Sequence, residues 1–286
     1  MPERIHEVLL TAQSLISERL KLQGAEARIE SQVLLQETLN VNLAWLIAHR
    51  HEELECNEYN RFRSLLERRL EGEPIAYILG YKEFYGLKLQ VSPATLIPRQ
   101  DTETLVDLAL KKISKVSEVS ILDLGTGSGA IALAIASQRP NATILATDVS
   151  EEALKIAVSN ANLLKLENIR FELGSWLNPT GAERFDFILS NPPYISLGDE
   201  HLGSGDLRYE PLGALISGVD GLKDIQAIVN SAADHLNPLG WLMLEHGYKQ
   251  SEEVADLMAE AGFKSISHER DIAGIPRVTL GQHSVF

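Results

Sequence analysis

Residues 190–194, Ser-Asn-Pro-Pro-Tyr, combine hydrogen-bond acceptors with a stiff backbone directly after an apolar stretch. Consecutive prolines fix the turn and remove two backbone N–H donors, so the nearby carbonyl oxygens remain available as acceptors. Asn191 adds a side-chain carbonyl oxygen, and Tyr194 adds a flat aromatic face. The stretch has no nucleophile and no histidine that could position a hydride. These residues therefore favour transfer of an electrophile to the nitrogen of a planar amine or amide.

Three alternating glycines form a second stretch with the residue types for a binding site. Gly125, Gly127 and Gly129 follow an apolar run at residues 119–124 and directly precede helix formers at residues 130–136. Glycine permits positive φ and lets a ligand approach where a Cβ would block it. The first turn of the helix then offers unpaired N–H groups and a partial positive charge to an anionic group. The stretch predicts a strand, a turn and a helix that bind a nucleoside-containing cofactor.

Asp148 extends this nucleotide-binding pattern. It closes a second apolar strand at residues 142–147 and follows Gly127 by 21 residues, close to the ~20-residue spacing of an acid that binds ribose hydroxyls. Gly125, Gly127 and Ala130 also satisfy the dinucleotide fingerprint G-x-G-x-x-G/A. A carboxylate at this position serves NAD and S-adenosylmethionine equally well. The turn alone does not distinguish NAD from S-adenosylmethionine. It is also compatible with a turn that binds no ligand and only packs the helix against the strand.

The composition limits the class of partner. The formal net charge is −14, the pI is about 5.0, and the chain has no long Lys/Arg run. Because neutralising phosphates requires a cationic surface, we expect no direct binding of nucleic acid. The single cysteine, Cys56, excludes an internal disulfide and a thiolate metal cluster, and no metal site is predicted. No apolar region resembles a signal peptide or reaches membrane-spanning length, so we expect a cytoplasmic protein without membrane contact.

The chain before the glycine turn divides into two kinds of pattern. Residues 2–71 keep an approximate helical period throughout, and Asn42 and Asn57 are predicted to cap two of the helices. Residues 81–91 alternate polar and apolar side chains on either side of a central glycine, which predicts a β-hairpin. The helical part carries no catalytic constellation and is interpreted as a lid or a partner-recognition domain.

The rest of the chain must position the two chemical stretches. Residues 92–103 contain two prolines and many polar side chains, so we expect an extended wall of the cofactor pocket, with Asp101 or Thr102 capping the next helix. Apolar strands then alternate with helical segments, as in a doubly wound α/β sheet that binds ligands at the carboxyl ends of its strands. The expected strands cover residues 119–124, 142–147, 169–173, 185–189, 241–245, 263–269 and 277–280.

Several motifs resemble those of a known enzyme family. Residues 123–129 and Asp148 resemble S-adenosylmethionine-binding motifs, and residues 191–194 are similar to the signature of methyltransferases that act on exocyclic or amide nitrogen. More specific matches lie at residues 72–77, 83–84, 91–103 and 277–281. Together these stretches resemble the PrmC/HemK family of peptide chain release factor N(5)-glutamine methyltransferases, over essentially the whole chain.

The resemblance implies a fold and a reaction. The fold is α/β, a Rossmann-like S-adenosylmethionine-dependent methyltransferase sheet with a small N-terminal helical domain joined by a β-hairpin. The expected parts are a helical substrate-recognition domain at 1–78, a hairpin linker at 79–100 and the methyltransferase domain at 101–286. The implied substrate is the glutamine of the Gly-Gly-Gln motif in class 1 release factors, and the products are N(5)-methylglutamine and S-adenosylhomocysteine. We expect a monomer with the release factor as its protein partner.

The resemblance also suggests roles for the two stretches. Asn191, Pro192 and Tyr194 are the expected catalytic residues. The Asn191 side-chain oxygen and the Pro192 carbonyl would accept the two amide N–H bonds, while Tyr194 would pack on the flat carboxamide. Pro193 joins them in substrate binding. The expected cofactor-binding residues are Gly125, Thr126, Gly127, Ser128, Gly129, Asp148, Trp176 and Asn191.

Two positions depart from the family pattern. Gln100 stands where the family usually has proline, and Ser175 stands where it usually has an acid. An acid there could accept a hydrogen bond from the adenine amine, so Ser175 puts that contact in question. Trp176 could pack on the adenine or in the core. Glu210 resembles a family segment near the substrate groove but could equally be a solvated loop carboxylate, so it is left outside the site.

Other functions share parts of this pattern. A DNA adenine amino-methyltransferase could use the same acceptors on a flipped base, although the net charge of −14 counts against it. A glutamine methyltransferase for a ribosomal protein would carry the same site and differs only in its substrate. An NAD-dependent oxidoreductase would leave residues 191–194 unexplained, and a non-catalytic scaffold would leave the intact site unexplained.

Overall fold

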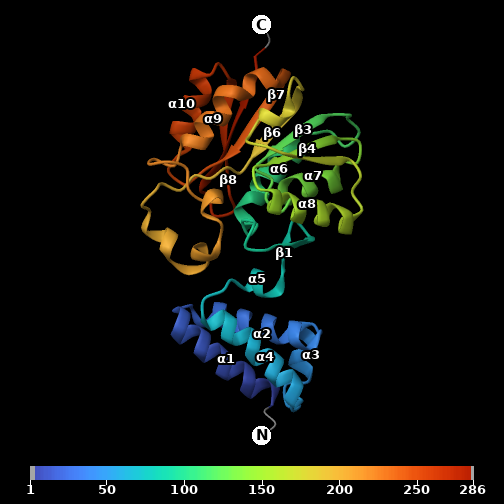
Figure 1. The fold of residues 1–286 in the computed structure, drawn as a ribbon, viewed down its shortest axis with the longest axis vertical. Helices are drawn as coiled ribbons and strands as arrows, with labels where there is room; N and C mark the ends of the chain where they lie inside the picture. The colour runs from blue at the N-terminus through green and yellow to red at the C-terminus, as the bar shows by residue number, and fades with distance from the viewer. Residues whose placement is uncertain (1–3, 285–286) are drawn as a thin grey trace. The chain divides into compact units, whose positions relative to one another are not determined.

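The computed structural model describes residues 4–284 and divides into two compact units (Figure 1). The smaller unit comprises the chain up to Gly80 together with His201–Tyr209. The larger comprises Tyr81–Glu200 and the chain from Glu210 onward. In this division the hairpin belongs to the larger unit, and a segment from the second half of the chain belongs with the helices.

The smaller unit is a helical bundle. Its helices bury one apolar stripe each, and the shared core includes Ile5, Ile16, Leu34 and Phe62. The helices are α1 (Ile5–Leu20), α2 (Gly24–Leu39), α3 (Leu43–Ala48), α4 (Cys56–Leu70) and α5 (Ile75–Leu79). The prediction of a helical N-terminal part is therefore confirmed.

The two expected helix caps in this unit have different outcomes. The Asn42 side chain accepts the backbone N–H of Trp45 at 2.9 Å and caps α3, as predicted. The prediction for Asn57 is wrong, because α4 already begins at Cys56. Glu55 occupies the N-cap position, and its backbone N–H donates to the Glu58 carboxylate at 3.0 Å. Glu55 and Glu58 thus form a capping box, and the helix begins one residue before Asn57 and not after it.

Arg69 joins His201–Tyr209 to the helices within the smaller unit. The residue is only 4% exposed, and its guanidinium forms a bidentate ion pair with Glu30, at 2.9 and 3.0 Å. A third contact at 3.0 Å reaches Asp206 in the short 3₁₀ segment η4 (Gly205–Tyr209). The Tyr209 hydroxyl adds a 2.8 Å bond to the carbonyl of Glu71. A single buried cation therefore organises both helical and inserted parts of this unit.

Replacing Arg69 with methionine should destabilise the protein by about 2 kcal/mol, because two carboxylates lose their buried partner. Urea unfolding followed by circular dichroism would measure the change. Arg63→Met is the matched control, since Arg63 is 64% exposed and pairs only with exposed Glu67. The control should cost less than about 1 kcal/mol. Equal effects of the two substitutions would contradict the role assigned to Arg69.

A β-hairpin opens the larger unit, as predicted. Strands β1 (Tyr81–Phe84) and β2 (Leu87–Gln90) pair antiparallel through a two-residue turn. Tyr85 and Gly86 both have positive φ, 51° and 73°, which is the backbone of a type I′ turn. Phe84 and Leu89 are fully buried and attach the hairpin to the core of the larger unit.

A seven-stranded sheet forms the centre of the larger unit, with the order β5-β4-β3-β6-β7-β9-β8. The predicted doubly wound α/β architecture is confirmed, with one unanticipated feature. Strand β9 runs antiparallel to both its neighbours, whereas the usual dinucleotide-binding order 3-2-1-4-5-6 is built from parallel strands. The strands are β3 (Ser120–Leu124), β4 (Thr143–Asp148), β5 (Ile169–Leu173), β6 (Phe185–Ser190), β7 (Leu236–Glu245), β8 (Lys264–Arg270) and β9 (Pro276–Gln282).

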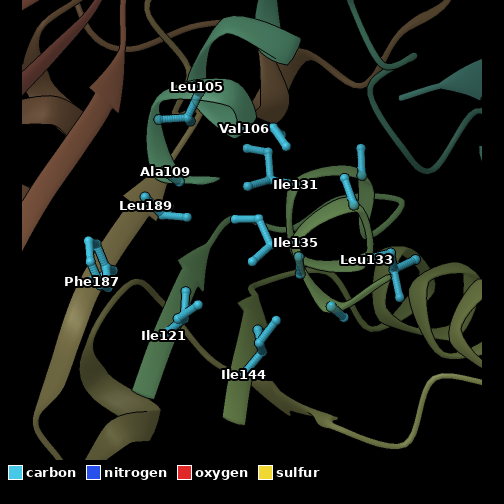
Figure 2. Close-up of a cluster of buried hydrophobic side chains, with 14 of the residues drawn as sticks. Leu105, Val106, Ala109, Ile121, Ile131, Leu133, Ile135, Ile144, Phe187 and Leu189 are labelled. Carbon is cyan, nitrogen blue, oxygen red and sulfur yellow. The ribbon is translucent and has the colours of Figure 1, made fainter. Parts of the chain in front are cut away.

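Helices cover both faces of this sheet. Alternate residues of a strand point to opposite faces, so Ile121 of β3 enters one core while Leu122 enters the other. Figure 2 shows the first core, where Leu105 and Ile135 come from helices and Ile144 and Leu189 from strands. The helices on that face are α6 (Glu103–Lys112), α7 (Ala130–Gln138) and α8 (Glu151–Leu164), and α9 (Lys223–Ala232) and α10 (Ser251–Glu260) cover the other (Figure 1).

No helix within residues 4–284 combines the length and the apolar character needed to cross a membrane.

Candidate active site

A cavity of about 320 Å³ lies in the larger unit, at the carboxyl ends of β3, β4 and β6. Six of the predicted site residues line it: Gly125, Gly127, Asp148, Trp176, Asn191 and Pro193. The other five, Thr126, Ser128, Gly129, Pro192 and Tyr194, are not among its lining residues. The two stretches singled out in the sequence therefore meet at one cavity, about 65 residues apart in the chain.

The glycine turn after β3 has the backbone that only glycine adopts easily. Gly125, Gly127 and Gly129 have φ values of 69°, 57° and 87°. A Cβ on Gly129 would lie 2.7 Å from Cδ1 of Leu133, so any other residue there would require the Leu133 side chain to move. Thr126 ties the turn to the end of β4, because its N–H donates to the Thr147 carbonyl at 2.9 Å.

Asp123 braces the same turn and does not line the cavity. The hydroxyl of Thr126 donates to its carboxylate at 2.6 Å, and the Asp123 side chain is 1% exposed. Burial raises the pKa of Asp123 to about 7, opposed by the hydrogen bond from Thr126. Asp123 therefore supports the turn and does not contact the cavity. Ionisation of its buried carboxyl group would cost free energy because the charge is removed from water.

Asp148 holds its carboxylate at the cavity with two backbone hydrogen bonds. Gly127 N–H donates to Oδ2 at 2.8 Å and Ser150 N–H donates to Oδ1 at 2.9 Å. Each carboxylate oxygen can accept more than one hydrogen bond, so both keep capacity for a hydroxyl ligand. Ser150 also caps α8 as predicted, with its hydroxyl accepting the N–H of Ala153 at 3.2 Å.

Trp176 belongs to both the cavity and the core. Its ring lines the cavity and packs partly against the second core cluster. A Cβ on Gly125 would lie 3.3 Å from Cζ3 of this ring, which leaves little room for any side chain at that glycine. Ser175 lines the cavity beside it. The extended segment at 92–103 forms another wall through Ala94, Thr95 and Leu96, in agreement with the prediction.

The acceptor corner begins where β6 ends. Ser190 donates its hydroxyl to the Leu124 carbonyl at 2.7 Å, which ties the ends of β6 and β3 together. Asn191 donates from Nδ2 to the hydroxyl oxygen of Thr102 at 3.1 Å. The side-chain oxygen of Asn191 is not used in this bond and remains available as an acceptor.

Tyr194 has a supporting position at this corner. Its hydroxyl donates to Oε1 of Glu245 at 3.3 Å, and its ring packs partly against the second core cluster. Burial, reinforced by the nearby Glu245 charge, raises the pKa of Tyr194. Burial likewise raises the pKa of Glu245 to about 7, against the positive charge of Arg277 and the hydrogen bond from Tyr194.

Several lining residues were not identified from the sequence. The solvated alternative for Glu210 is wrong: it is 4% exposed and pairs with Arg99 at 2.5 Å, and the neighbouring Pro211 lines the cavity. Val149 lines the cavity and is 75% exposed. An apolar residue directly after Asp148, at the end of a strand, is a sequence signal that could have identified it. Further lining residues with no sequence signal are Ala153, Gly174, Gly213, Ala214 and Asp224.

The described residues contain no group of three or more His, Cys, Asp and Glu side chains that could hold a metal ion. The lining of the cavity combines the fixed Asp148 carboxylate with the Asn191 amide and apolar side chains.

Comparison with known proteins connects this geometry to a family. Residues 11–80 match the family model "PrmC N-terminal domain", and residues 115–274 match "Methyltransferase domain". A release factor glutamine methyltransferase from Aliivibrio fischeri is 44% identical over 92% of this chain and 93% of its own. One from Xylella fastidiosa is 46% identical over 89% and 93%.

A solved structure also shares the fold. A methyltransferase from Pyrococcus furiosus aligns with a TM-score of 0.53 and 20% identity, covering 77% of this chain and 98% of its own. The sequence relatives carry the stronger argument, because their identity extends through both units. On that basis the chain belongs to the release factor glutamine methyltransferase family.

Proposed function

We propose that this enzyme transfers a methyl group from S-adenosylmethionine to the side-chain nitrogen of a glutamine in a peptide chain release factor. One observation carries the proposal: a nucleoside-type glycine turn and the acceptor residue Asn191 line the same cavity. Further support comes from the family to which the chain belongs and from the match of its helical unit to the PrmC N-terminal domain. The substrate residue is the glutamine of the Gly-Gly-Gln motif in class 1 release factors.

The residues present fit S-adenosylmethionine. The Asp148 carboxylate, fixed by two backbone N–H groups, suits the ribose hydroxyls. Gly125 and Gly127 allow close approach of the ligand, and Trp176 and Val149 offer apolar surface to the adenine. When bound, the cofactor supplies an electrophilic methyl group on a sulfonium. Thr126, Ser128 and Gly129 support this pocket by holding the turn.

Methyl transfer to an amide is difficult because the nitrogen lone pair is delocalised into the carbonyl. The Asn191 side-chain oxygen and the Pro192 carbonyl accept the two N–H bonds of the substrate amide. They orient its nitrogen and stabilise the positive charge that develops there. Pro193 walls the cavity next to Asn191, and Tyr194 holds the corner through Glu245 and contributes its ring to the carboxamide site.

The helical unit is the proposed recognition domain for the release factor. A cavity of about 550 Å³ within that unit combines apolar side chains such as Leu20 and Ile29 with the charges of Arg19, Glu26 and Asp206. Mixed apolar and charged walls of this kind suit a protein surface. The protein is expected to act as a cytoplasmic monomer on a protein substrate, without binding nucleic acid directly.

The test is incubation with labelled S-adenosylmethionine and a purified class 1 release factor, followed by mass spectrometry of the Gly-Gly-Gln peptide. One added methyl on the glutamine is the expected result. A release factor carrying glutamate in place of that glutamine is the matched control and should stay unmodified. Methyl incorporation into duplex DNA or a ribosomal protein, with none into the release factor, would overturn the proposal.

Asp148→Ala should weaken S-adenosylmethionine binding by about 30-fold, because the ribose loses its acceptors and the glycine turn loses a brace. The turnover number at saturating cofactor should fall much less. Isothermal titration calorimetry gives the dissociation constant, and Asp234→Ala, at an exposed position outside the cavity, is the control. An unchanged dissociation constant in Asp148→Ala would refute the assignment of this carboxylate to the cofactor.

A further inference from the structure

Gln250 lies at the turn between β7 and α10 and forms hydrogen bonds through both ends of its side-chain amide. Its Oε1 accepts the backbone N–H of Gly247 at 2.8 Å. Its Nε2 donates to the backbone carbonyl of Tyr194 at 3.2 Å and makes a longer contact, at 3.5 Å, with that of Asp220. A carbonyl only accepts and a backbone N–H only donates, so these partners allow one orientation of the amide. One half-buried side chain therefore joins three segments of the chain.

Two glycines leave the space that this contact needs. A Cβ on Gly221 would lie 2.3 Å from the Tyr194 carbonyl oxygen and 2.8 Å from Nε2 of Gln250. A Cβ on Gly247 would lie 2.8 Å from Oε1 of Gln250 and 3.6 Å from Cδ2 of the Tyr194 ring. Gly221 also has a φ of 80°, a backbone that other residues rarely adopt. Close approach of the backbone at two positions thus allows Gln250 to reach the carbonyl of Tyr194.

Tyr194 is held at two points by residues at the end of β7. Gln250 binds its carbonyl, and its hydroxyl donates to Oε1 of Glu245 at 3.3 Å. At the other end of the same corner, the Ser190 hydroxyl donates to the carbonyl of Leu124 at 2.7 Å. The three residues between these anchors include two prolines, whose fixed φ transmits the position of either end to the residues between them. The placement of the acceptor oxygens at residues 191 and 192 therefore depends on both anchors.

We propose that Gln250 is a positioning residue for methyl transfer, which holds the Tyr194 carbonyl and so fixes where the Asn191 and Pro192 oxygens lie. This inference rests on the function proposed above for Asn191 and Pro192. Gln250 is not among the residues that line the cavity, so it acts through the corner and not by contact with substrate or cofactor. Without its NH₂ group the corner loses an anchor, and the acceptor oxygens lose their alignment with the substrate amide.

Gln250→Glu keeps the shape of the side chain and the acceptor for Gly247, but it replaces the NH₂ group by a carboxylate oxygen that cannot donate. The turnover number kcat should fall about 10-fold in single-turnover assays, while the dissociation constant of S-adenosylmethionine changes less than about twofold. Gln250→Met has neither the donor nor a charge and should lower kcat by a similar factor. A merely structural role would lower the amount of folded enzyme and leave kcat per folded molecule unchanged.

Gln282→Glu is the matched control. Gln282 is also half-buried, and its Nε2 donates to a backbone carbonyl, that of Leu239, at 3.0 Å. In the sheet Gln282 pairs with Trp241, whereas Glu245, which contacts the corner, lies at the other end of β7. The same exchange of amide for carboxylate at this position should leave kcat at the wild-type value.

A readout without substrate tests the contact of Gln250 with Tyr194 directly. The chain has seven tyrosines, so ¹³C labelling of tyrosine carbonyl carbons gives at most seven resonances. The resonance of Tyr194 is assigned by its loss in Tyr194→Phe. A hydrogen bond polarises the carbonyl group, so this resonance should move in Gln250→Glu and Gln250→Met and stay in place in Gln282→Glu.

The possible outcomes separate this inference from the proposed function. A Tyr194 resonance that stays in place in both Gln250 variants, or wild-type kcat in Gln250→Met, refutes the positioning role. A loss of kcat in Gln282→Glu as large as that in Gln250→Glu refutes it as well. Absence of methyl transfer by the wild-type enzyme refutes the proposed function instead, and the resonance still decides whether Gln250 holds Tyr194.

Discussion

Asn191→Ala is expected to lower kcat for glutamine methylation by about 10³-fold, the largest effect of any single substitution in this protein. Asn191 lines the cavity, and in the proposed reaction its side-chain oxygen accepts an N–H from the nitrogen that becomes positively charged during transfer. Removing one preorganised hydrogen-bond partner of a developing charge costs about 10²- to 10³-fold in kcat in other enzymes. In the proposed reaction Asn191 also orients the nucleophilic amide nitrogen, so we expect a decrease in kcat at the upper end of this range. Single-turnover assays with saturating S-adenosylmethionine would measure the rate.

The substitution should act on chemistry and not on the cofactor. Within the described part of the chain, Asn191 makes no hydrogen bond to the Asp148 carboxylate, which is held by Gly127 and Ser150, so the dissociation constant of S-adenosylmethionine should change by less than about threefold. Asn230→Ala, on the exposed face of α9, is the control and should leave both quantities unchanged. Loss of cofactor binding together with surviving chemistry would invert the roles assigned here to Asn191 and Asp148.

Asp123→Asn is expected to change how stability depends on pH. Burial raises the pKa of Asp123 from 3.8 to about 7, so between these values the folded protein holds a proton that the unfolded chain has released. Stability contributed by this group is therefore present at low pH and lost as the pH rises towards and through 7. Between pH 5 and pH 8 the loss amounts to about 3 kcal/mol, at 1.36 kcal/mol per unit of pKa shift.

The asparagine variant has no such proton to lose. Its stability relative to wild type should therefore increase by about 3 kcal/mol from pH 5 to pH 8, whatever constant offset the new amide introduces. Urea unfolding of both proteins at several pH values gives this difference directly. The variant keeps an oxygen that can accept the Thr126 hydroxyl, so the glycine turn is preserved. Parallel stability curves for the two proteins would contradict the buried, protonated state of Asp123.

The sequence was most informative where local rules decide the structure. The type I′ turn at Tyr85 and Gly86, the cap of α8 by Ser150 and the glycine turn after β3 all depend on residues within a few positions of one another. The meeting of this turn with Asn191 also followed, because parallel strands bring their carboxyl ends to one edge of a sheet. Periodicity and motif spacing are sufficient for features of this kind.

Features that depend on distant pairs were not predictable in the same way. Thr102 meets Asn191 across 89 residues, and Arg99 buries Glu210 across 111 residues. A carboxylate in a loop has the same local pattern whether it is solvated or paired, so nothing near Glu210 distinguished the two states. The reversal of β9 and the grouping of His201–Tyr209 with the helices likewise depend on tertiary contacts.

The grouping of His201–Tyr209 with the helices means that the backbone passes between the two units three times, after Gly80, after Glu200 and after Tyr209. A gene fragment stopping at Gly80 would consequently lack the carboxylate of Asp206 that Arg69 binds, and would expose the carbonyl that Tyr209 covers. Recombination that replaces the helical unit with that of a relative would have to exchange two separate coding segments, one for the chain up to Gly80 and one for His201–Tyr209. Inheritance of the helical unit is thereby linked to the loop that follows the Asn-Pro-Pro-Tyr corner.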